Sequence, residues 1–321
     1  MAPTAAGDPD TSSPLRLVAP DKCAGMRLDQ ALAELLDDVS RSQAGALIRA
    51  GHCTVDGAPG KPSLKLRPGS VIVLEVAEPE TDVIPAQVPL DIVFEDTCFI
   101  ALNKPQGMAS HPAPGTGDET LLNGLVGYAR GIWRPALIHR LDRGTSGLIL
   151  ASKTVASHRN LREQMSSGDL KRTYLALVWG EFERNAGTID APIGRDRGQK
   201  TRMAVLDAGD PARTHYRMLG TAKHTDGPVS LVEVRLETGR THQIRVHMGF
   251  IGHPLVGERI YRGGTEPRRW EPGLPGQMLH SWRVVFAHPE TGEAVRLEAC
   301  LPGAFNSLVD ELGLDGSLGR S

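Results

Sequence analysis

The feature that most limits the fold is a series of short apolar segments that begins near residue 90 and continues to about residue 290. Each segment is rich in Val, Ile and Leu and ends at Gly, Pro, Asn or Asp, which is typical of β-strands. The strand candidates are LDIVFED, CFIALNKP, LILASK, TYLALVWG, VSLVEVRLE and RVVFAH. A clear helix is predicted over 157–168, and no blade or solenoid repeat is present. The pattern predicts an α+β domain with a mixed, largely antiparallel β-sheet flanked by helices and loops.

A second, smaller unit precedes this domain. Between residues 26 and 76 apolar residues recur at helical spacing, and Asp56-Gly57 is a typical hairpin turn between two short strands. We expect a small α+β unit that presents a surface, because so short a segment builds only a marginal core. The expected divisions are a disordered arm over 1–20, this unit over 21–77, a linker over 78–89, the large domain over 90–305 and a tail over 306–321.

Charge and composition exclude some classes of protein. The formal net charge of −2 predicts no general attraction to nucleic acid, although basic residues outnumber acidic ones between residues 41 and 67. Such a face can bind phosphate, but charge alone favours a solvated surface. No apolar run reaches the roughly 18 residues of a membrane helix, and the N-terminal residues lack a secretion signal. With four scattered cysteines, we expect reduced thiols and a cytoplasmic protein without a membrane partner.

Several common reaction centres are missing from the sequence. It contains no phosphate-binding P-loop, no dinucleotide-binding glycine pattern and no serine nucleophile elbow. His242, His247 and His253 lie close together, but their spacing is not that of a metalloprotease and no acidic residue lies among them. Because Arg240 and Arg245 would also repel a dication, we expect no metal site.

The segment HRLDRGTSG, residues 139–147, has one carboxylate between basic residues and a glycine-rich turn. Asp142 can shape the turn by accepting backbone amides. It can also act as a nucleophile or base on an anionic substrate that nearby arginines hold. The residues alone favour the two interpretations equally.

Four motifs resemble those of the RluA-type RNA pseudouridine synthases. They are NKPQGMASHPAPG, HRLDRGTSGLILASKT, ETGRTHQIRVHMGFIGHPLVGERIY and LHSWRVVFAHPETGE. The unit over residues 26–76 resembles the S4-type RNA-binding domain that many members carry in front. The resemblance spans about residues 26–303 in the family's order, which is more specific than any single motif. Within the family, the chain is most similar to the D-type synthases that modify the large ribosomal subunit.

The resemblance implies roles for particular residues. Asp142 matches the essential aspartate, Arg245 the arginine that pairs with it, and Tyr174 the tyrosine that stacks on the uracil. Arg140 matches the residue that fills the place of the flipped base. The implied contacts to substrate and RNA are Arg140, His139, Arg143, Thr145, Arg240, His242, Gln243, Arg41, Arg49 and Lys61. Within this set we expect His139 to bond the backbone near the turn and Thr145 to support the loop.

The implied activity is the isomerisation of specific uridines to pseudouridine in large-subunit (23S) ribosomal RNA. RNA is the expected partner, no cofactor or metal is needed for an isomerisation, and we expect a monomer. Two alternatives stay open: the same reaction on transfer RNA, and a non-catalytic RNA-binding ribosome assembly factor. The basic loop over 195–202 fits a phosphate grip and a solvated loop equally well.

Two places depart from the family pattern. Ala109 and Ser110 stand where members often carry valines, which predicts a looser pocket wall. Arg213 stands where a smaller residue is common. We expect both to alter which RNA fits and neither to touch the chemistry.

Overall fold

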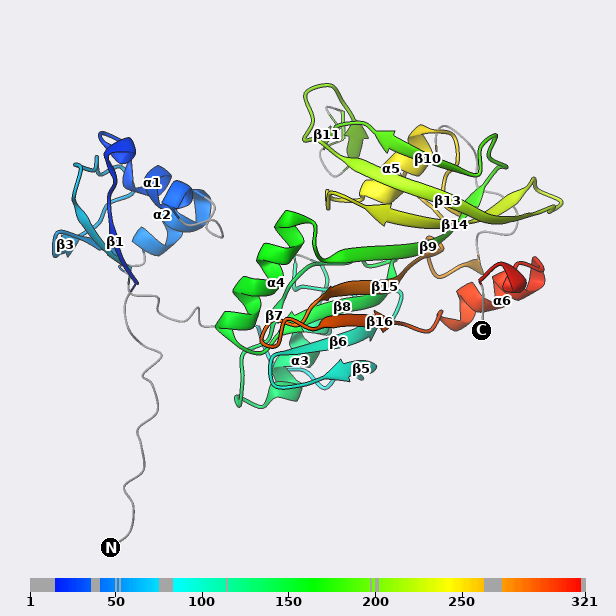
Figure 1. Ribbon diagram of the computed structural model, residues 1–321, viewed down its shortest axis with the longest axis horizontal. Coiled ribbons are helices and arrows are strands. Elements are labelled where there is room, and N and C mark those ends of the chain that lie inside the picture. The colour runs from blue at the N-terminus through cyan, green and yellow to red at the C-terminus, as the bar shows by residue number, and fades with distance from the viewer. Residues whose placement is uncertain are drawn as a thin grey trace, which may run out of the picture. The chain divides into compact units, whose positions relative to one another are not determined.

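The computed structural model describes residues 15–35, 41–49, 51, 53–74, 83–113, 115–196, 198–199, 202–262 and 273–318. Contacts divide the chain into two units, residues 1–82 and 83–321, and each is described by itself. The predicted mixed α+β fold is confirmed (Figure 1). Among the described residues, no helix combines the length and the apolar character that crossing a membrane requires.

The N-terminal unit pairs a four-stranded antiparallel sheet with two helices. Its elements are β1 (Leu15–Val18), η1 (Asp21–Cys23), α1 (Leu28–Leu35), α2 (Arg41–Arg49), β2 (Cys53–Val55), β3 (Ala58–Pro59) and β4 (Val71–Leu74). The strand order is β1-β4-β2-β3. Asp56 and Gly57 both have positive φ angles and connect β2 to β3, as the sequence predicted. Both helices bury one apolar face against the sheet, which gives this unit a core of its own.

The start of the N-terminal unit corrects one expectation. Residues 15–18, which we assigned to a disordered arm, form β1 and pair with β4 along its whole length. Leu17 packs against the core and Ala19 is buried. The strand forms because the apolar residues after Pro14 pack against this core. Residues 1–14 of the expected arm lie outside the described residues.

The larger unit is built on a ten-stranded sheet. Its strands are β5 (Ile92–Glu95), β6 (Phe99–Lys104), β7 (Ala136–Leu137), β8 (Ser146–Ser152), β9 (Lys171–Trp179), β10 (Ala186–Asp190), β13 (Arg213–Ala222), β14 (Val229–Leu236), β15 (Leu279–Ala287) and β16 (Ala294–Glu298). The main order is β10-β13-β14-β9-β15-β8-β6-β5, with β16 beside β15 and β7 beside β8. Every pairing is antiparallel except that of β15 with β8. A separate hairpin joins β11 (Ile193–Arg195) to β12 (Met203–Val205).

Both faces of this sheet are buried, and alternate residues of each central strand serve opposite faces. The helices are α3 (Leu121–Ala129), α4 (Val155–Ser167), α5 (Gln243–Phe250) and α6 (Gly303–Glu311), followed by η3 (Asp315–Leu318). One face is covered by α3 and α5, whose side chains join a cluster with Tyr174 and Leu141. On the other face, α4 packs against β6 and β8, while α6 packs against β9 and β14. The face under α3 and α5 therefore carries the residues that the motifs singled out.

The boundaries of the larger unit differ from the expected ones. Residues 78–82 of the expected linker lie outside the described residues, whereas residues 83–89 pack along α3, where the amide of Asn123 donates to the carbonyl of Ile84 at 2.8 Å. Near the other end, α6 runs across the boundary that we placed at residue 305. It buries Phe305, Leu308 and Val309, so these residues belong to the core and not to a tail.

Candidate active site

The segment between β7 and β8 forms a tight turn that presents Asp142. The carbonyl of Asp142 accepts the backbone N–H of Thr145 at 3.0 Å, which closes the turn. Ahead of it, the Ser110 hydroxyl both accepts the N–H of Leu141 and donates to its carbonyl, at 3.1 and 2.8 Å. The hydroxyl of Ser110 thus fixes the residue next to Asp142, and the looser wall stays a prediction.

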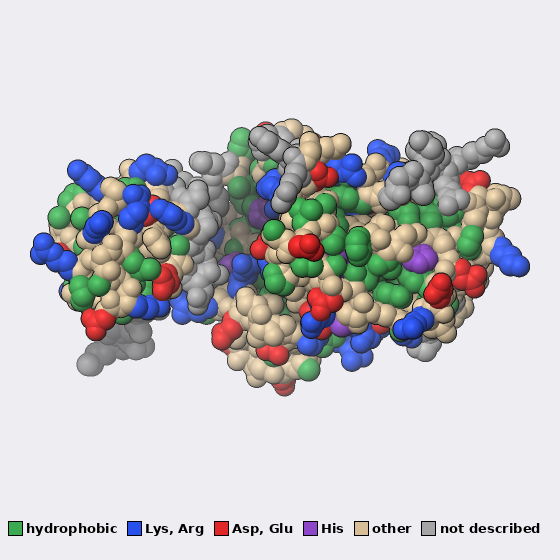
Figure 2. All heavy atoms as spheres, turned by 90° about the horizontal axis from the view of Figure 1, so that it is seen from above, with side chains coloured by type: hydrophobic (Ala, Val, Ile, Leu, Met, Phe, Trp, Pro, Cys, Tyr) green, Lys and Arg blue, Asp and Glu red, His purple; other side chains and the backbone are tan. Residues whose placement is uncertain are grey.

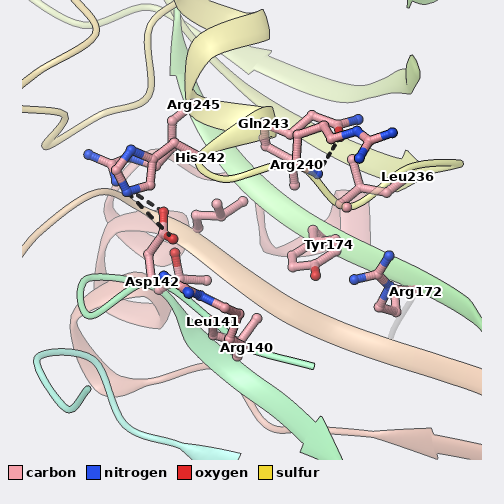
Figure 3. Close-up of a pocket in the computed structure, with 14 residues that line it drawn as sticks. Arg140, Leu141, Asp142, Arg172, Tyr174, Leu236, Arg240, His242, Gln243 and Arg245 are labelled. Carbon is pink, nitrogen blue, oxygen red and sulfur yellow. Dashed lines mark hydrogen bonds and ion pairs between the residues drawn. The ribbon is translucent and has the colours of Figure 1, made fainter. Parts of the chain in front are cut away.

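The carboxylate of Asp142 meets the guanidinium of Arg245. Nη1 of Arg245 donates to Oδ2 of Asp142 at 3.0 Å (Figure 3). The Arg245 side chain is 8% exposed and that of Asp142 21% exposed, so the carboxylate keeps access to a ligand while the guanidinium is buried. A charge-assisted bond of this kind holds an ionised carboxylate in one orientation.

Glu258 holds Arg245 from behind, a contact that sequence reasoning missed. It accepts from Nε and Nη2 of Arg245 at 2.7 and 2.9 Å, and its side chain is fully buried. Burial alone would lower the pKa of Arg245, but the hydrogen bonds and the charge of Glu258 raise that pKa above its usual value. The available signal was that Glu258 is the only acidic residue between Thr238 and Arg262.

His242 and Tyr261 complete the surroundings of the pair. His242 adopts a left-handed backbone conformation at the start of α5, and its Nδ1 lies 2.6 Å from the Tyr261 hydroxyl. Burial lowers the pKa of His242, which favours the neutral ring, and its Nε2 lies 3.8 Å from Asp142. The Tyr261 ring lies 5.1 Å from the Arg245 guanidinium, in the range of a cation–π contact.

A cavity of about 70 Å³ opens beside this pair. Its walls include Asp142 and Arg245 at one end, Tyr174 on β9 across from them, and the exposed Arg140. Figure 3 shows Tyr174 and Arg172 side by side on the same strand, facing the loop that carries Arg240. A second, larger hollow of about 740 Å³ also reaches Asp142 and is lined by Arg140, Arg143 and Arg259. Asp142 is thus reached from a small cavity and from a larger, basic one.

Lys104 is a further buried charge near the site. It is completely buried, and its Nζ donates to the carbonyls of Pro105 and Met108 at 3.0 and 2.8 Å. Burial lowers the pKa of Lys104 to about 7, and the charge of Asp142 acts in the opposite direction. The two carbonyl contacts show that Lys104 shapes the NKPQGM loop beside the larger hollow.

Three of the predicted RNA contacts, Gln243, Thr145 and His139, are buried, and the first two line the cavity beside Asp142. Both side-chain donors of Gln243 reach Arg213 and Thr214, and its oxygen accepts from Thr238 and Arg240. Thr145 accepts from the amide of Gln277 at 3.2 Å. His139 is buried as well, and burial first, then nearby Arg172 and Arg162, lowers its pKa to about 3.

We expected His139 to bond the backbone, but neither of its ring nitrogens has a hydrogen-bond partner among the described residues. The other predicted contacts in the larger unit, Arg140, Arg143, Arg240 and His242, are exposed or half-buried. Of these, Arg143 also donates from Nε to the carbonyl of Gly107 at 2.8 Å.

The N-terminal contacts Arg41, Arg49 and Lys61 are exposed on their own unit. Figure 2 shows many Lys and Arg side chains on the visible face of that unit. Two residues of the basic loop, Arg197 and Lys200, lie outside the described residues. Arg213, the other departure from the family pattern, pairs with Asp190 and Glu237 on the sheet surface.

The described residues contain one group of side chains with the spacing of a metal site: Asp96, Cys98 and His288. Hydrogen bonds already occupy these atoms. Nδ1 of His288 accepts the N–H groups of Glu290 and Thr291, so the ring proton is on Nε2, which donates to Asp96 at 2.8 Å. The thiol of Cys98 lies 3.1 Å from the Glu290 carboxylate. His247 and His253 bond elsewhere, to Thr214 and to the Trp179 carbonyl.

Comparisons with known proteins agree with this geometry. A family model described as RNA pseudouridylate synthase matches residues 98–249, and one described as S4 domain matches residues 26–72. A protein of Nitrosomonas europaea named ribosomal large subunit pseudouridine synthase D is 40% identical, covering 96% of this chain and 91% of its own. An uncharacterized RNA pseudouridine synthase of Bacillus subtilis is 39% identical, covering 94% and 98%. The structure of human RNA pseudouridylate synthase domain containing 1 has a TM-score of 0.55 and 26% identity, covering 70% and 95%.

Proposed function

This chain belongs to the RNA pseudouridylate synthase family, and on that premise we propose that it isomerises specific uridines of large-subunit (23S) ribosomal RNA to pseudouridine. The observation that carries the proposal is the ion pair of Asp142 with the buried Arg245, which borders a cavity that also contains Tyr174. The choice of RNA is supported by relatives named for the large subunit in Nitrosomonas europaea and Pseudomonas aeruginosa.

Asp142 supplies the carboxylate that starts the reaction. Arg245 holds it in one orientation, because its guanidinium donates a charge-assisted hydrogen bond to Oδ2. The bond from the sugar C1′ to N1 of uracil breaks, the uracil turns within the cavity, and C1′ bonds to C5. The proton on C5 then leaves and N1 takes up a proton in its place, so substrate and product have the same composition and no oxidant, reductant or energy source is needed.

Tyr174 and Arg140 handle the base. Tyr174 offers a flat face for the uracil and a hydroxyl near the ring. Arg140, exposed beside Asp142, takes the place in the stack that the uridine leaves. Extruding a base from its stack costs a few kcal/mol. This cost is lowest in loops, so we propose loop uridines as targets.

The S4 domain supplies a second grip on RNA. Arg41, Arg49 and Lys61 are exposed on it, and phosphate contacts position an RNA without reading its sequence. All four cysteines are free thiols, which supports action in the cytoplasm. We propose that the enzyme acts there as a monomer.

A pseudouridine map of ribosomal and transfer RNA, from cells with and without this chain, tests the proposal. We expect pseudouridines of large-subunit RNA to vanish without the chain and to return with the wild-type chain but not with Asp142→Asn. Loss of sites in transfer RNA alone would overturn the ribosomal substrate. If no site vanishes, the chain acts as a non-catalytic assembly factor and the proposed activity is wrong.

A further inference from the structure

Arg172 is a cavity residue that the reaction described above does not use. It lies two residues before Tyr174 on β9, so both side chains point to the same face of the sheet. Both line the cavity that contains Asp142 (Figure 3). The motifs gave no reason to select Arg172, because a basic residue at a strand start is common on protein surfaces.

One nitrogen of the Arg172 guanidinium is buried without a partner. The residue is 9% exposed, and its Nε has no hydrogen-bond partner among the described residues. No ion pair joins Arg172 to any described acid. Arg245 and Arg162 differ from Arg172 in this respect, since Arg245 binds Glu258 and Asp142, while Arg162 donates to the carbonyl of Ile138. A buried charge without a partner is unfavourable, so such a residue is retained for a ligand or a switch.

The neighbours of Arg172 leave room for its side chain but do not neutralise it. A Cβ added to Gly239 would lie 3.3 Å from Nη2 of Arg172, so the glycine lets the guanidinium lie against the loop backbone. His139 is neutral, because burial and the neighbouring arginines lower its pKa to about 3. A neutral imidazole cannot balance the charge of a guanidinium.

The cavity as a whole has an excess of positive charge. Its lining contains four arginines, Arg140, Arg172, Arg240 and Arg245, and a single carboxylate, Asp142. Asp142 is already paired with Arg245. An anion that enters this cavity therefore meets a positive electrostatic field, which no counter-charge beside Arg172 weakens.

We propose that Arg172 binds a phosphate group of the RNA strand that flanks the uridine in the cavity. The inference rests on the proposed function for the identity of the ligand as RNA. Uracil is neutral and cannot pair with a buried cation, whereas the phosphodiesters on either side of the uridine each carry one negative charge. The planar guanidinium fits two phosphate oxygens at once.

Substitution of Arg172 tests this with paired readouts. We expect Arg172→Met to raise the KM for a short RNA stem-loop about tenfold, as loss of one charge-assisted contact does. The salt dependence of log KM should weaken by about 0.7 per decade, the value for one phosphate contact on a single strand. The melting temperature should rise, because a buried unpaired charge is removed. Arg172→Lys should restore part of the affinity.

Arg296→Met is the matched control. Arg296 is exposed on β16, and its loss should leave the KM and the salt dependence unchanged. If Arg172→Met keeps the wild-type KM and salt dependence, the inference is wrong. A fall in melting temperature with unchanged KM would assign Arg172 a structural role instead.

Modified substrates locate the phosphate. Neutral methylphosphonates replace the phosphates on each side of the target uridine, one at a time. At the phosphate that Arg172 contacts, the methylphosphonate and Arg172→Met remove the same interaction. Combining the two should therefore weaken binding no more than either change does alone. Additive losses at both positions overturn the proposal.

Binding is also measured by fluorescence anisotropy with Asp142→Asn as the parent protein, which needs no turnover. The Arg172 contact is then tested even if the reaction differs from the proposed one. Conversely, a wild-type chain that forms no pseudouridine overturns the function without deciding the phosphate contact.

Discussion

Arg245 donates from Nε and Nη2 to the two oxygens of Glu258, and this fork leaves Nη1 to face Asp142 at 3.0 Å. Glu258, Arg245 and Asp142 thus form a continuous series of ion pairs from the buried interior to the cavity. Glu258 is fixed in turn by the backbone N–H groups of Arg259 and Ile260, at 3.0 and 2.8 Å. The orientation of the Asp142 carboxylate therefore depends on a residue that is remote from the substrate.

Replacing Glu258 should separate stability from catalysis. Glu258→Gln leaves Arg245 with a weaker partner, and we expect a stability loss of roughly 3 kcal/mol and a kcat loss of about ten- to a hundredfold. Glu233 on β14 is the matched control, since it is also buried and binds Arg217 on β13 and Arg235 on β14. Glu233→Gln should lose stability but keep kcat. Equal losses of kcat in both variants would contradict a positioning role for Glu258.

Asp142→Asn should remove activity without unfolding the protein. The amide keeps the shape of the side chain, and Arg245 keeps Glu258, so the fold should remain. We expect pseudouridine formation to fall at least about 10³-fold, as for other essential catalytic side chains. Mass spectrometry of product RNA, thermal melting and RNA binding are measured together. Wild-type turnover in this variant would refute the proposed mechanism.

The larger unit should lose stability in mild acid. Burial lowers the pKa of His139 to about 3 and that of His280 to about 4. As the pH falls below the unfolded value of about 6.5, the unfolded chain gains protons that the native state does not. Below pH 6.5 each group then costs about 1.4 kcal/mol per pH unit, so between pH 7 and pH 5 we expect a total loss of about 4 kcal/mol.

Tryptophan fluorescence in urea measures this loss, because Trp133, Trp179, Trp270 and Trp282 all belong to the larger unit. His280→Asn should remove about half of the pH dependence, since one of the two groups is lost. A free energy of unfolding that is constant between pH 7 and pH 5 would show that these rings are protonated in the native state.

Gly147 should tolerate no side chain. It has φ +106°, and a Cβ there would overlap the carbonyl oxygen of Ser281 on β15. We expect Gly147→Ala to cost about 4 kcal/mol or more. Gly131 also has positive φ, but a Cβ there meets open space, so Gly131→Ala should cost only about 1 kcal/mol. Similar melting temperatures for the two variants would contradict the close approach of β8 and β15.

The sequence predicted the sheet well where strands are apolar. The candidates at 98–105 and 229–237 correspond closely to β6 and β14. The start of β15 was missed because His280 and Ser281 are polar yet completely buried. β13 was not predicted at all: its residues are mostly half-buried, so their pattern shows no clear alternation. The expected helix over 157–168 begins two residues earlier, where Thr154 caps α4.

The site was predictable only as far as the motifs reach. Asp142, Tyr174 and Arg245 follow from their positions in the motifs, and the structure brings them to one cavity. Glu258 and Arg172 were not predicted, because their importance lies in which partner each has or lacks after folding. Spacing along the chain contains no information about such partners when they are 13 positions apart and the end of a helix lies between them, as for Arg245 and Glu258.

The pairing of β15 has a consequence for the order in which the enzyme becomes functional during translation. Ser281 lies opposite Tyr174 on one side and opposite Gly147 on the other, and among the described strands β8 and β9 share no direct pairing. The strand between the two halves of the site is therefore synthesised after both of them. A nascent chain that lacks β15 has no strand to join β8 to β9, so catalysis begins only after β15 has been synthesised and has inserted between them.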